Sequence, residues 1–461
     1  MRIVLVALSM QAAPAQAAGL DGAGLSLLWN IPFAGVLLSI AALPLLAPRW
    51  WLAHHGACAA FWAAALLLPL GWVFGAGLAW QLLLHVGLQD YLLFVLLLVA
   101  LYTTGGGIRL KGHLDGTPAT NTALLVTGTV LASLLGTTGA SVLLIRPVLR
   151  ANAHRRRKTH VFVFFIFLVS NIGGALTPLG DPPQYLGFLL AVSFVWPLTH
   201  LFGPFLLCAA VLLTAFFLLD RWHFTREAHP LPPTPDGPAA IAGWVNVALL
   251  LLIIGVVLAQ GIWQPGRVVV LGEPVAIERL AGMVAFIAII LASLALTPAG
   301  LRAANHFRWL PMTEVAQLFA AIFLCMMPAL AMLQAGAGGP FAALVAVTSD
   351  AAGQPVPWVY FWLTGVLSSF FDNAPTYLVF FNLAGGDAAW LMGAGAPVLV
   401  AISCGAVFMG ALTYIGNAPN FLVRAIVEDD GVRMPGFLGY LGWACLWLLP
   451  LFVFVTFVFF L

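Results

Sequence analysis

The chain has 461 residues, of which 62% are hydrophobic and only 7% are charged; with soluble domains carrying about 25% charged residues, this excludes a soluble fold. Apolar runs of about 20 residues recur along the chain and predict an all-α polytopic membrane protein whose main partner is the lipid bilayer. The net charge of +2 gives no reason to expect a nucleic acid partner, because the basic residues are confined to loops.

The N-terminal segment resembles a secretory signal peptide. Arg2, the apolar run "IVLVALSM" and the small-residue stretch "APAQAA" supply its three parts. We therefore expect residues 1–18 to be a signal peptide, with a frayed N-terminal helix as the alternative. Five cysteines lie singly inside apolar runs and are expected to be packing residues.

The rest of the chain divides into two halves of similar order. Residues 19–228 form a first transmembrane repeat, 229–239 a Pro-rich linker expected in the cytoplasm, and 240–461 a second repeat. Each half is predicted to have three spans, a pair of half-length segments, a broken span and a final span. The predicted segments are 31–47, 57–83, 90–108, 121–146, 160–197 and 201–220, then 240–263, 279–298, 312–334, 357–385, 396–427 and 437–460.

The basic residues constrain the orientation of these segments. If each half-length pair is a re-entrant hairpin, most basic residues fall in the cytoplasm, and only Arg267 and Arg279 fall outside. The cytoplasmic set is then 146–160, 221–227, 301–309 and 424–433, with Arg49, Arg109 and Lys111. The two halves start on opposite sides, which is the inverted repeat typical of secondary transporters. No GxxxxGK[ST] stretch is present, so ATP-driven transport would need a partner chain.

The two broken spans carry related sequences. "ALTPLGDPPQYL" (175–186) and "ALTYIGNAPNFL" (411–422) share Ala, Leu, Thr, Gly, Pro and Leu at a constant offset. Proline cannot continue a helix, and freed backbone groups at membrane depth need protein, water or an ion as partners. The hairpin tips "TTGAS" (137–141) and "FDNAPT" (371–376) correspond more weakly, with Gly139-Ala140 opposite Asn373-Ala374. We expect 137–141, 170–183, 371–376 and 412–419 to converge near the membrane midplane with non-helical backbone.

Asp181 and Asp372 are the two acids that this topology places at membrane depth. Such groups are functional by default, although each could instead cap a half-helix; Asp372 has the weaker reason to be a cap. Together with Ser, Thr and Asn oxygens they predict a site for a hard cation, with Na⁺ at Asn171, Asp181, Asp372 and Asn373. The candidate ion-binding residues are Thr137, Thr138, Ser141, Ser170, Asn171, Thr177, Asp181, Asp372, Asn373, Thr376, Thr413 and Asn417. No resident cofactor is expected, only transported Na⁺ and H⁺.

Three motifs carry a family resemblance: "SNIGGALTPLGDPPQYLGF" (170–188), "SSFFDNAPTYLVF" (368–380) and "GALTYIGNAPNFLVRAI" (410–426). They resemble motifs of the ion transporter superfamily, in particular NhaD-type bacterial sodium/proton antiporters and chains labelled as citrate transporters. The resemblance implies a scaffold, a mobile transport domain moving like an elevator, two re-entrant hairpins, a homodimer and the bacterial inner membrane. In the carboxylate-transporting branch, Ser-Asn-Thr motifs at the hairpin tips bind sodium and substrate, whereas the first tip here lacks Asn.

Two transport functions remain open. One is cation/proton antiport with Asp181 and Asp372 as the exchange groups; the other is sodium-coupled uptake of a di- or tricarboxylate at half-helix N-termini. The break motifs contain two acids and no Lys or Arg, which favours the cation; oxyanion efflux ranks third. An enzyme is not expected, because the sequence shows neither a GxSxG serine nor a paired-His motif.

Overall fold

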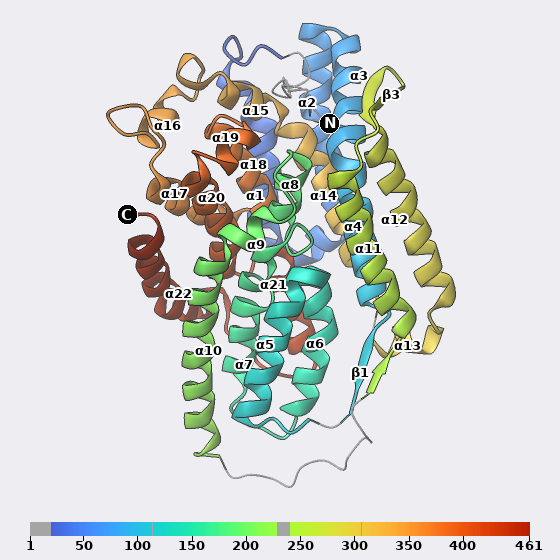
Figure 1. The fold of residues 1–461 in the computed structure, drawn as a ribbon, viewed down its shortest axis with the longest axis vertical. Helices are drawn as coiled ribbons and strands as arrows, with labels where there is room; N and C mark the ends of the chain where they lie inside the picture. Colours follow the sequence, from blue (N-terminus) through green and yellow to red (C-terminus); the bar gives the residue numbers. More distant parts are fainter. Residues whose placement is uncertain (1–19, 113, 228–239, 306) are drawn as a thin grey trace, which may run out of the picture.

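The computed structural model describes residues 20–112, 114–227, 240–305 and 307–461 (Figure 1). The expected signal peptide (1–18) and the expected linker (229–239) lie outside these residues. The elements of the first half are η1 (Leu27–Asn30), α1 (Ile31–Leu46), α2 (Pro48–Phe74), α3 (Ala76–His85), the π-helical η2 (Val86–Tyr91), α4 (Leu92–Gly105), β1 (Arg109–Lys111), α5 (Pro118–Leu135), α6 (Thr137–Ala151), α7 (Thr159–Leu168), η3 (Ile172–Leu176), α8 (Pro182–Leu189), α9 (Trp196–His200) and α10 (Phe202–Phe224).

The second half repeats this helical pattern. Its elements are β2 (Ala240–Ala242), α11 (Trp244–Ile262), β3 (Arg267–Val270), β4 (Glu273–Ala276), α12 (Ile277–Leu296), α13 (Ala299–Ala304), α14 (Leu310–Cys325), α15 (Met327–Gln334), η4 (Gly336–Gly338), α16 (Ala342–Val347), α17 (Pro357–Phe370), α18 (Asn373–Leu383), α19 (Ala388–Met392), α20 (Ala396–Met409), η5 (Gly410–Leu412), α21 (Ala418–Asp429) and α22 (Phe437–Phe459). The strands form two short antiparallel pairs, β1 with β2 and β3 with β4.

The helices show that this is an all-α polytopic membrane protein. Within the described residues, 10 helical segments are long and apolar enough to cross a membrane. Two of them form the interior, since 89% of the residues in Thr159–Leu176 and 78% of the most apolar 18 residues in Leu310–Gln334 are buried. The others turn large apolar side chains outward, such as Trp72 of α2, which is 91% exposed. An apolar exterior around a buried centre is what a bilayer requires of a protein.

Two spans cover this part of the chain as predicted, but the boundary predicted between them, from 57–83 and 90–108, was wrong. α2 ends at Phe74 because Gly75 has φ of 93°, a left-handed conformation that ends a helix and favours glycine. Helical backbone then continues from Ala76 to Gly105 through the π-helical turn at 86–91. Asp90 lies within this segment and not at its end. The predicted gap at 84–89 therefore lies inside helical backbone.

The two ends of the molecule separate the loops as predicted. Figure 1 places the α6–α7 connection, β1 and α13 at the lower end, and β3 and α16 at the upper end. Residues 146–160 are thus far from 264–278 and from 335–356. At the lower end Thr159 Oγ1 donates to the Arg433 carbonyl at 3.3 Å, which places the segment after α21 beside the start of α7.

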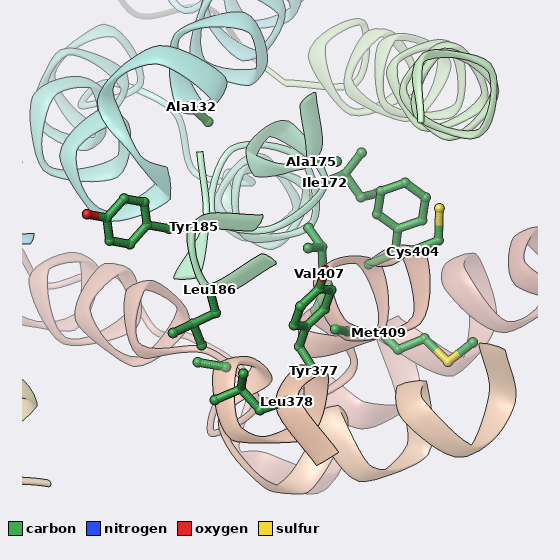
Figure 2. Packing of buried hydrophobic residues seen from close by; sticks show 14 of the residues in the cluster. Ala132, Ile172, Ala175, Tyr185, Leu186, Tyr377, Leu378, Cys404, Val407 and Met409 are labelled. Carbon is green, nitrogen blue, oxygen red and sulfur yellow. The ribbon is translucent and has the colours of Figure 1, made fainter. Parts of the chain in front are cut away.

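Apolar packing between the two halves holds the broken helices together. Figure 2 shows Ile172 of η3 close to Val407 of α20, and Leu186 of α8 close to Leu378 of α18. All four side chains are buried in one hydrophobic cluster. Because the contacts cross from one half to the other, they fix the position of each break relative to its counterpart.

Candidate functional site

Four interruptions of the helical backbone build the predicted site. They are Gly136 between α5 and α6, 169–181 between α7 and α8, 371–372 between α17 and α18, and 410–417 between α20 and α21. Gly136 has φ of 78°, and a Cβ there would lie 3.3 Å from the Leu179 carbonyl oxygen, so this turn needs glycine. The prediction of non-helical backbone over 137–141 was wrong, because α6 begins at Thr137 directly after the turn. The predicted tip 371–376 is likewise helical from Asn373 onward.

Prolines set where the helices resume. Pro182 is the first residue of α8, and Pro419 lies in the first turn of α21. Proline is well accommodated there, because the amide it lacks would have no partner within the helix. The two proline-bearing motifs therefore both end a break and start a helix.

The two broken spans make the same contact with their neighbouring helix pair. Thr177 Oγ1 donates to the carbonyl of Ser133 at the end of α5, and Thr413 Oγ1 donates to the carbonyl of Ser369 at the end of α17. Each hydroxyl also accepts from the backbone N–H two residues further on, at 3.2 Å. The two donors are 236 residues apart in the sequence, and so are the two acceptors. The sequence repeat is therefore also a repeat of three-dimensional contacts.

This shift of 236 residues corrects the predicted match of the helix tips. It pairs Thr137, the first residue of α6, with Asn373, the first residue of α18. The sequence comparison had instead set Gly139-Ala140 opposite Asn373-Ala374, which is two residues out of register. The same shift pairs Asp181 with Asn417, so one repeat supplies a carboxylate where the other supplies an amide.

Asp181 is the point at which the four breaks meet. Its carboxylate is only 2% exposed. Thr137 Oγ1 donates to Oδ1 at 2.8 Å, Asn417 Nδ2 donates to Oδ1 at 3.3 Å, and Asn373 Nδ2 donates to Oδ2. The Thr137 N–H also donates to the Gly180 carbonyl at 2.8 Å. Side chains in or directly after the other three breaks thus donate to the carboxylate of this one, and the expectation that the four segments come together is confirmed.

A second group of polar side chains surrounds this centre. Asn171 Oδ1 accepts from Asn417 at 3.3 Å, and Asn171 Nδ2 donates to Asn420 Oδ1 at 2.7 Å. The Ser141 and Ser170 hydroxyls are 2.9 Å apart, and Asn417 also donates to the Ser170 carbonyl at 3.1 Å. All five residues are buried. The Ser170–Asn171 pair therefore positions Asn417, which in turn contacts Asp181.

Asp372 and Asp181 have different roles at their helix starts. The sequence predicted that Asp372 would be the weaker helix cap, and the structure shows the reverse. Asp372 is half-buried, and its Oδ1 accepts from the Ala374 N–H at 3.1 Å, so it caps α18. Asp181 occupies the cap position of α8 but makes no capping bond, because its oxygens accept from other breaks. The expectation that Asp372 would be the less cap-like acid was wrong. The reason is that local sequence shows cap positions and not the long-range donors that compete for them.

The remaining two predicted residues lie in the first turns of α18 and α6. Thr376 Oγ1 donates to the Asp372 carbonyl at 3.0 Å, and Thr138 is half-buried in the first turn of α6. Sequence reasoning missed three partners: Ser133, Ser369 and Asn420. The 236-residue shift relates the two serines, and Asn420 stands inside the quoted motif "APNFL". Asn420 was detectable as a second asparagine in the motif, three residues after Asn417.

The chemistry around Asp181 is that of oxygen donors and amides. Among the described residues, no hydrogen bond or ion pair joins Asp181 to Lys, Arg or His. The Asn373 Oδ1 atom is buried and has no hydrogen-bond partner in the described part of the chain. A buried acceptor without a donor is costly. The site therefore offers a carboxylate and an open amide oxygen beside it, a donor set suited to a small hard cation.

Comparison with protein families shows which family the chain belongs to. Residues 22–460 match the family model CitMHS_2, which is described as putative citrate transport. The chain belongs to this family. The match covers nearly the whole chain and agrees with the resemblance to the ion transporter superfamily and to citrate transporters. The curated proteins contain no match to the chain.

The family membership makes this chain part of a transporter family and not of an enzyme family. Together with the apolar helices, it identifies a multi-pass membrane protein of the secondary ion or carboxylate transporter type.

Proposed function

We propose that the protein is a sodium/proton antiporter in which Asp181 alternately holds the cation and the proton. The observation that carries this proposal is the position of Asp181, buried where four breaks meet and bound by Thr137, Asn373 and Asn417. A carboxylate at membrane depth without a basic partner is costly unless an ion neutralises it. A proton or a cation can each do so, but one carboxylate cannot carry both charges.

The neighbouring amides would adapt to either bound species. Asn373 presents an Nδ2 donor to the carboxylate and an Oδ1 acceptor that has no hydrogen-bond partner among the described residues. Turning this amide would exchange donor for acceptor and place a second oxygen beside Asp181. An oxygen pair from Asp181 and Asn373 would then begin the coordination of Na⁺, while Asn171 would act through Asn417. Asp372 would add a second negative charge near the site while it caps the N-terminus of α18.

We further propose that the protein has two re-entrant hairpins, moves by an elevator-like step and works as a homodimer. The α5–α6 and α17–α18 pairs would be re-entrant hairpins, although α5 (18 residues) and α6 (15 residues) are longer than the predicted half-length. The helices around Asp181 would move as one body in an elevator-like step. The protein would work as a homodimer in the bacterial inner membrane. The deep burial of Thr159–Leu176 supports a compact transport unit.

A second candidate is sodium-coupled uptake of a di- or tricarboxylate. The family description, which refers to citrate transport, favours it. The first turns of α18 and α21 meet near Asp181, and free N–H groups at helix starts bind carboxylates well. In this scheme Na⁺ on Asp181 would neutralise the site before the anion enters.

Everted membrane vesicles with a fluorescent pH indicator distinguish the two functions. We expect added Na⁺ to release protons from acidified vesicles that contain the protein, with no response in vesicles that lack it. Accumulation of labelled citrate in right-side-out vesicles, dependent on sodium and without Na⁺-triggered proton movement in everted ones, would contradict antiport. Such a result would establish the second candidate.

A further inference from the structure

One basic residue near the β3–β4 hairpin, at the upper end of Figure 1, makes contacts that the Asp181 site does not explain. Arg279 stands in the first turn of α12. Its Nη1 donates to the Gln89 carbonyl in η2 at 2.6 Å, and its Nη2 donates to the Leu189 carbonyl at the end of α8 at 2.8 Å. We propose that Arg279 is a latch, which holds the body that carries Asp181 to a frame of η2, α4 and α12 and releases it when that body moves. The inference rests on the elevator-like movement proposed above.

Helix α8 connects the latch with the ion site. Asp181 is the residue before its first turn, and Leu189 is its last residue, so one helix of 8 residues joins the two. At 1.5 Å per residue this helix is about 12 Å long. A Cβ on Gly187 would lie 2.5 Å from the Tyr377 hydroxyl oxygen, so α8 packs closely against α18. Helix α8 is therefore part of the body that surrounds Asp181, and a bond to its last carbonyl restrains that body.

The rest of the contact between α8 and the frame is apolar. Tyr185 packs against Phe94 of α4 with ring centroids 6.2 Å apart, and its hydroxyl has no hydrogen-bond partner among the described residues. Within the described part of the chain, the bond from Arg279 to Leu189 is the one hydrogen bond that joins α8 to η2, α4 or α12. Hydrophobic contact is non-directional, so the rings can slide past each other, whereas the Arg279 bond must break.

The frame side of the latch is fixed to the β3–β4 hairpin. Gln89 Nε2 donates to the Pro274 carbonyl of β4 at 3.0 Å, and Gln89 Oε1 accepts from Arg279 Nη1 at 3.3 Å. His85 Nδ1 lies 3.4 Å from Glu273 Oε2. The turn that carries Gln89 is π-helical, a distortion that is frequent at functional sites. Because η2, β4 and α12 are joined in this way, α8 is the partner that leaves when the latch opens.

Carboxylates beside the latch give Arg279 a second position. Asp90 follows Gln89 in η2, and its carboxylate is within electrostatic range of Arg279. Glu278 precedes Arg279, and its buried Oε2 has no hydrogen-bond partner among the described residues. Neither acid forms an ion pair in that part of the chain. A guanidinium binds a carboxylate more strongly than it binds neutral carbonyls. When α8 moves away, Arg279 can turn to Asp90, which stabilises the released state.

Spin labels on the full-length protein in nanodiscs measure the latch without an assay of transport. A label at Ser193→Cys, exposed after α8, and one at Leu271→Cys, exposed between β3 and β4, report the distance between body and frame. Cys58 and Cys445, the native cysteines that are not fully buried, are replaced by alanine. We expect two distances, with the latched one more populated. Arg279→Gln should lower the ratio of latched to released protein about tenfold, the effect of one charge-assisted hydrogen bond.

Three further variants separate the latch from a general effect of charge. Asp90→Asn should raise the latched fraction, because the released state loses its partner for Arg279. Arg267→Gln, an equal loss of charge at an exposed position of β3, should leave the ratio unchanged. If Arg279→Gln does not fold, Arg279→Lys should lower the ratio to a smaller degree, because an ammonium keeps the charge but lacks the planar fork that binds both carbonyls.

Several results would overturn the proposal. These are an unchanged ratio in both Arg279 variants, an equal fall in Arg267→Gln, or a fall in Asp90→Asn. A single distance that no variant changes would refute the latch together with the elevator-like movement, while sodium-dependent proton exchange through Asp181 could still be observed in vesicles. Failure of that exchange with the expected latch ratios would instead refute antiport alone.

Discussion

Replacing Asp181 with Asn removes a charge and nearly preserves shape. Thr137 and Asn417 both donate to Oδ1, and an amide oxygen in that place can accept from both. The new amide nitrogen would replace Oδ2 and face Asn373. Because Asn373 Oδ1 has no hydrogen-bond partner in the described residues, a turn of that amide would let it accept the new N–H. We therefore expect the free energy of unfolding to fall by only about 1 kcal/mol, the value of one weakened hydrogen bond.

The effect on transport should be far larger than the effect on stability. Without a carboxylate, position 181 can neither neutralise a cation nor release a proton. Na⁺-triggered proton movement in everted vesicles should fall to the level of vesicles without the protein. Gel filtration in detergent should show the same amount of folded Asp181→Asn as wild type. Asp387→Asn, at the exposed cap of α19, is the matched control and should exchange normally, because Asn caps helices as well as Asp.

Wild-type exchange by Asp181→Asn would refute this reasoning. So would complete loss of flux in Asp372→Asn with normal flux in Asp181→Asn, because Asn preserves the cap of α18 and the account places the exchange at Asp181. Loss of folded Asp181→Asn protein would make the carboxylate structural.

Three other predictions concern the frame of the site. Thr413→Val removes the donor to the Ser369 carbonyl and should lower the free energy of unfolding by about 1–3 kcal/mol; an unchanged melting temperature would contradict the repeat contact. Gly180→Ala should prevent folding, because a Cβ there would lie 2.2 Å from the Gly174 carbonyl oxygen. Gly300→Ala should be neutral, because a Cβ there would meet no atom of the described residues within 4 Å. Equal expression of both variants would contradict the packing. Single cysteines in 146–160 and 335–356 should react with impermeant reagents from opposite sides, and labelling from one side would refute the topology.

The sequence predicted the breaks because their signals are local. Proline disfavours a continuing helix whatever the tertiary contacts are, so the clusters of proline, glycine and polar residues around Pro182 and Pro419 marked the broken spans. A single proline in an apolar run is a weaker signal, since Pro69 and Pro147 lie inside helices. The constant spacing of the motifs also predicted that the two halves are related. The structure adds that Thr177 and Thr413 make equivalent bonds with the preceding helix pair.

The partners within the site were less predictable. Asp181 and Asp372 both stand in front of a half-helix, so local sequence could not say which acid caps and which accepts from distant residues. Asn373 contacts Asp181 across 192 positions, a distance over which no spacing rule holds. The Gly75 boundary was missed because apolar residues lie on both sides of it. Hydropathy therefore gave no sign that one span had ended.

Binding of radioactive Na⁺ to the purified protein tests the central assignment to Asp181. Wild-type protein should bind sodium at alkaline pH and lose it as protons compete at lower pH. Asp181→Asn should bind no sodium at any pH, while Asp387→Asn should match wild type. Sodium binding by Asp181→Asn that equals wild type in affinity and pH dependence would show that the cation is held elsewhere.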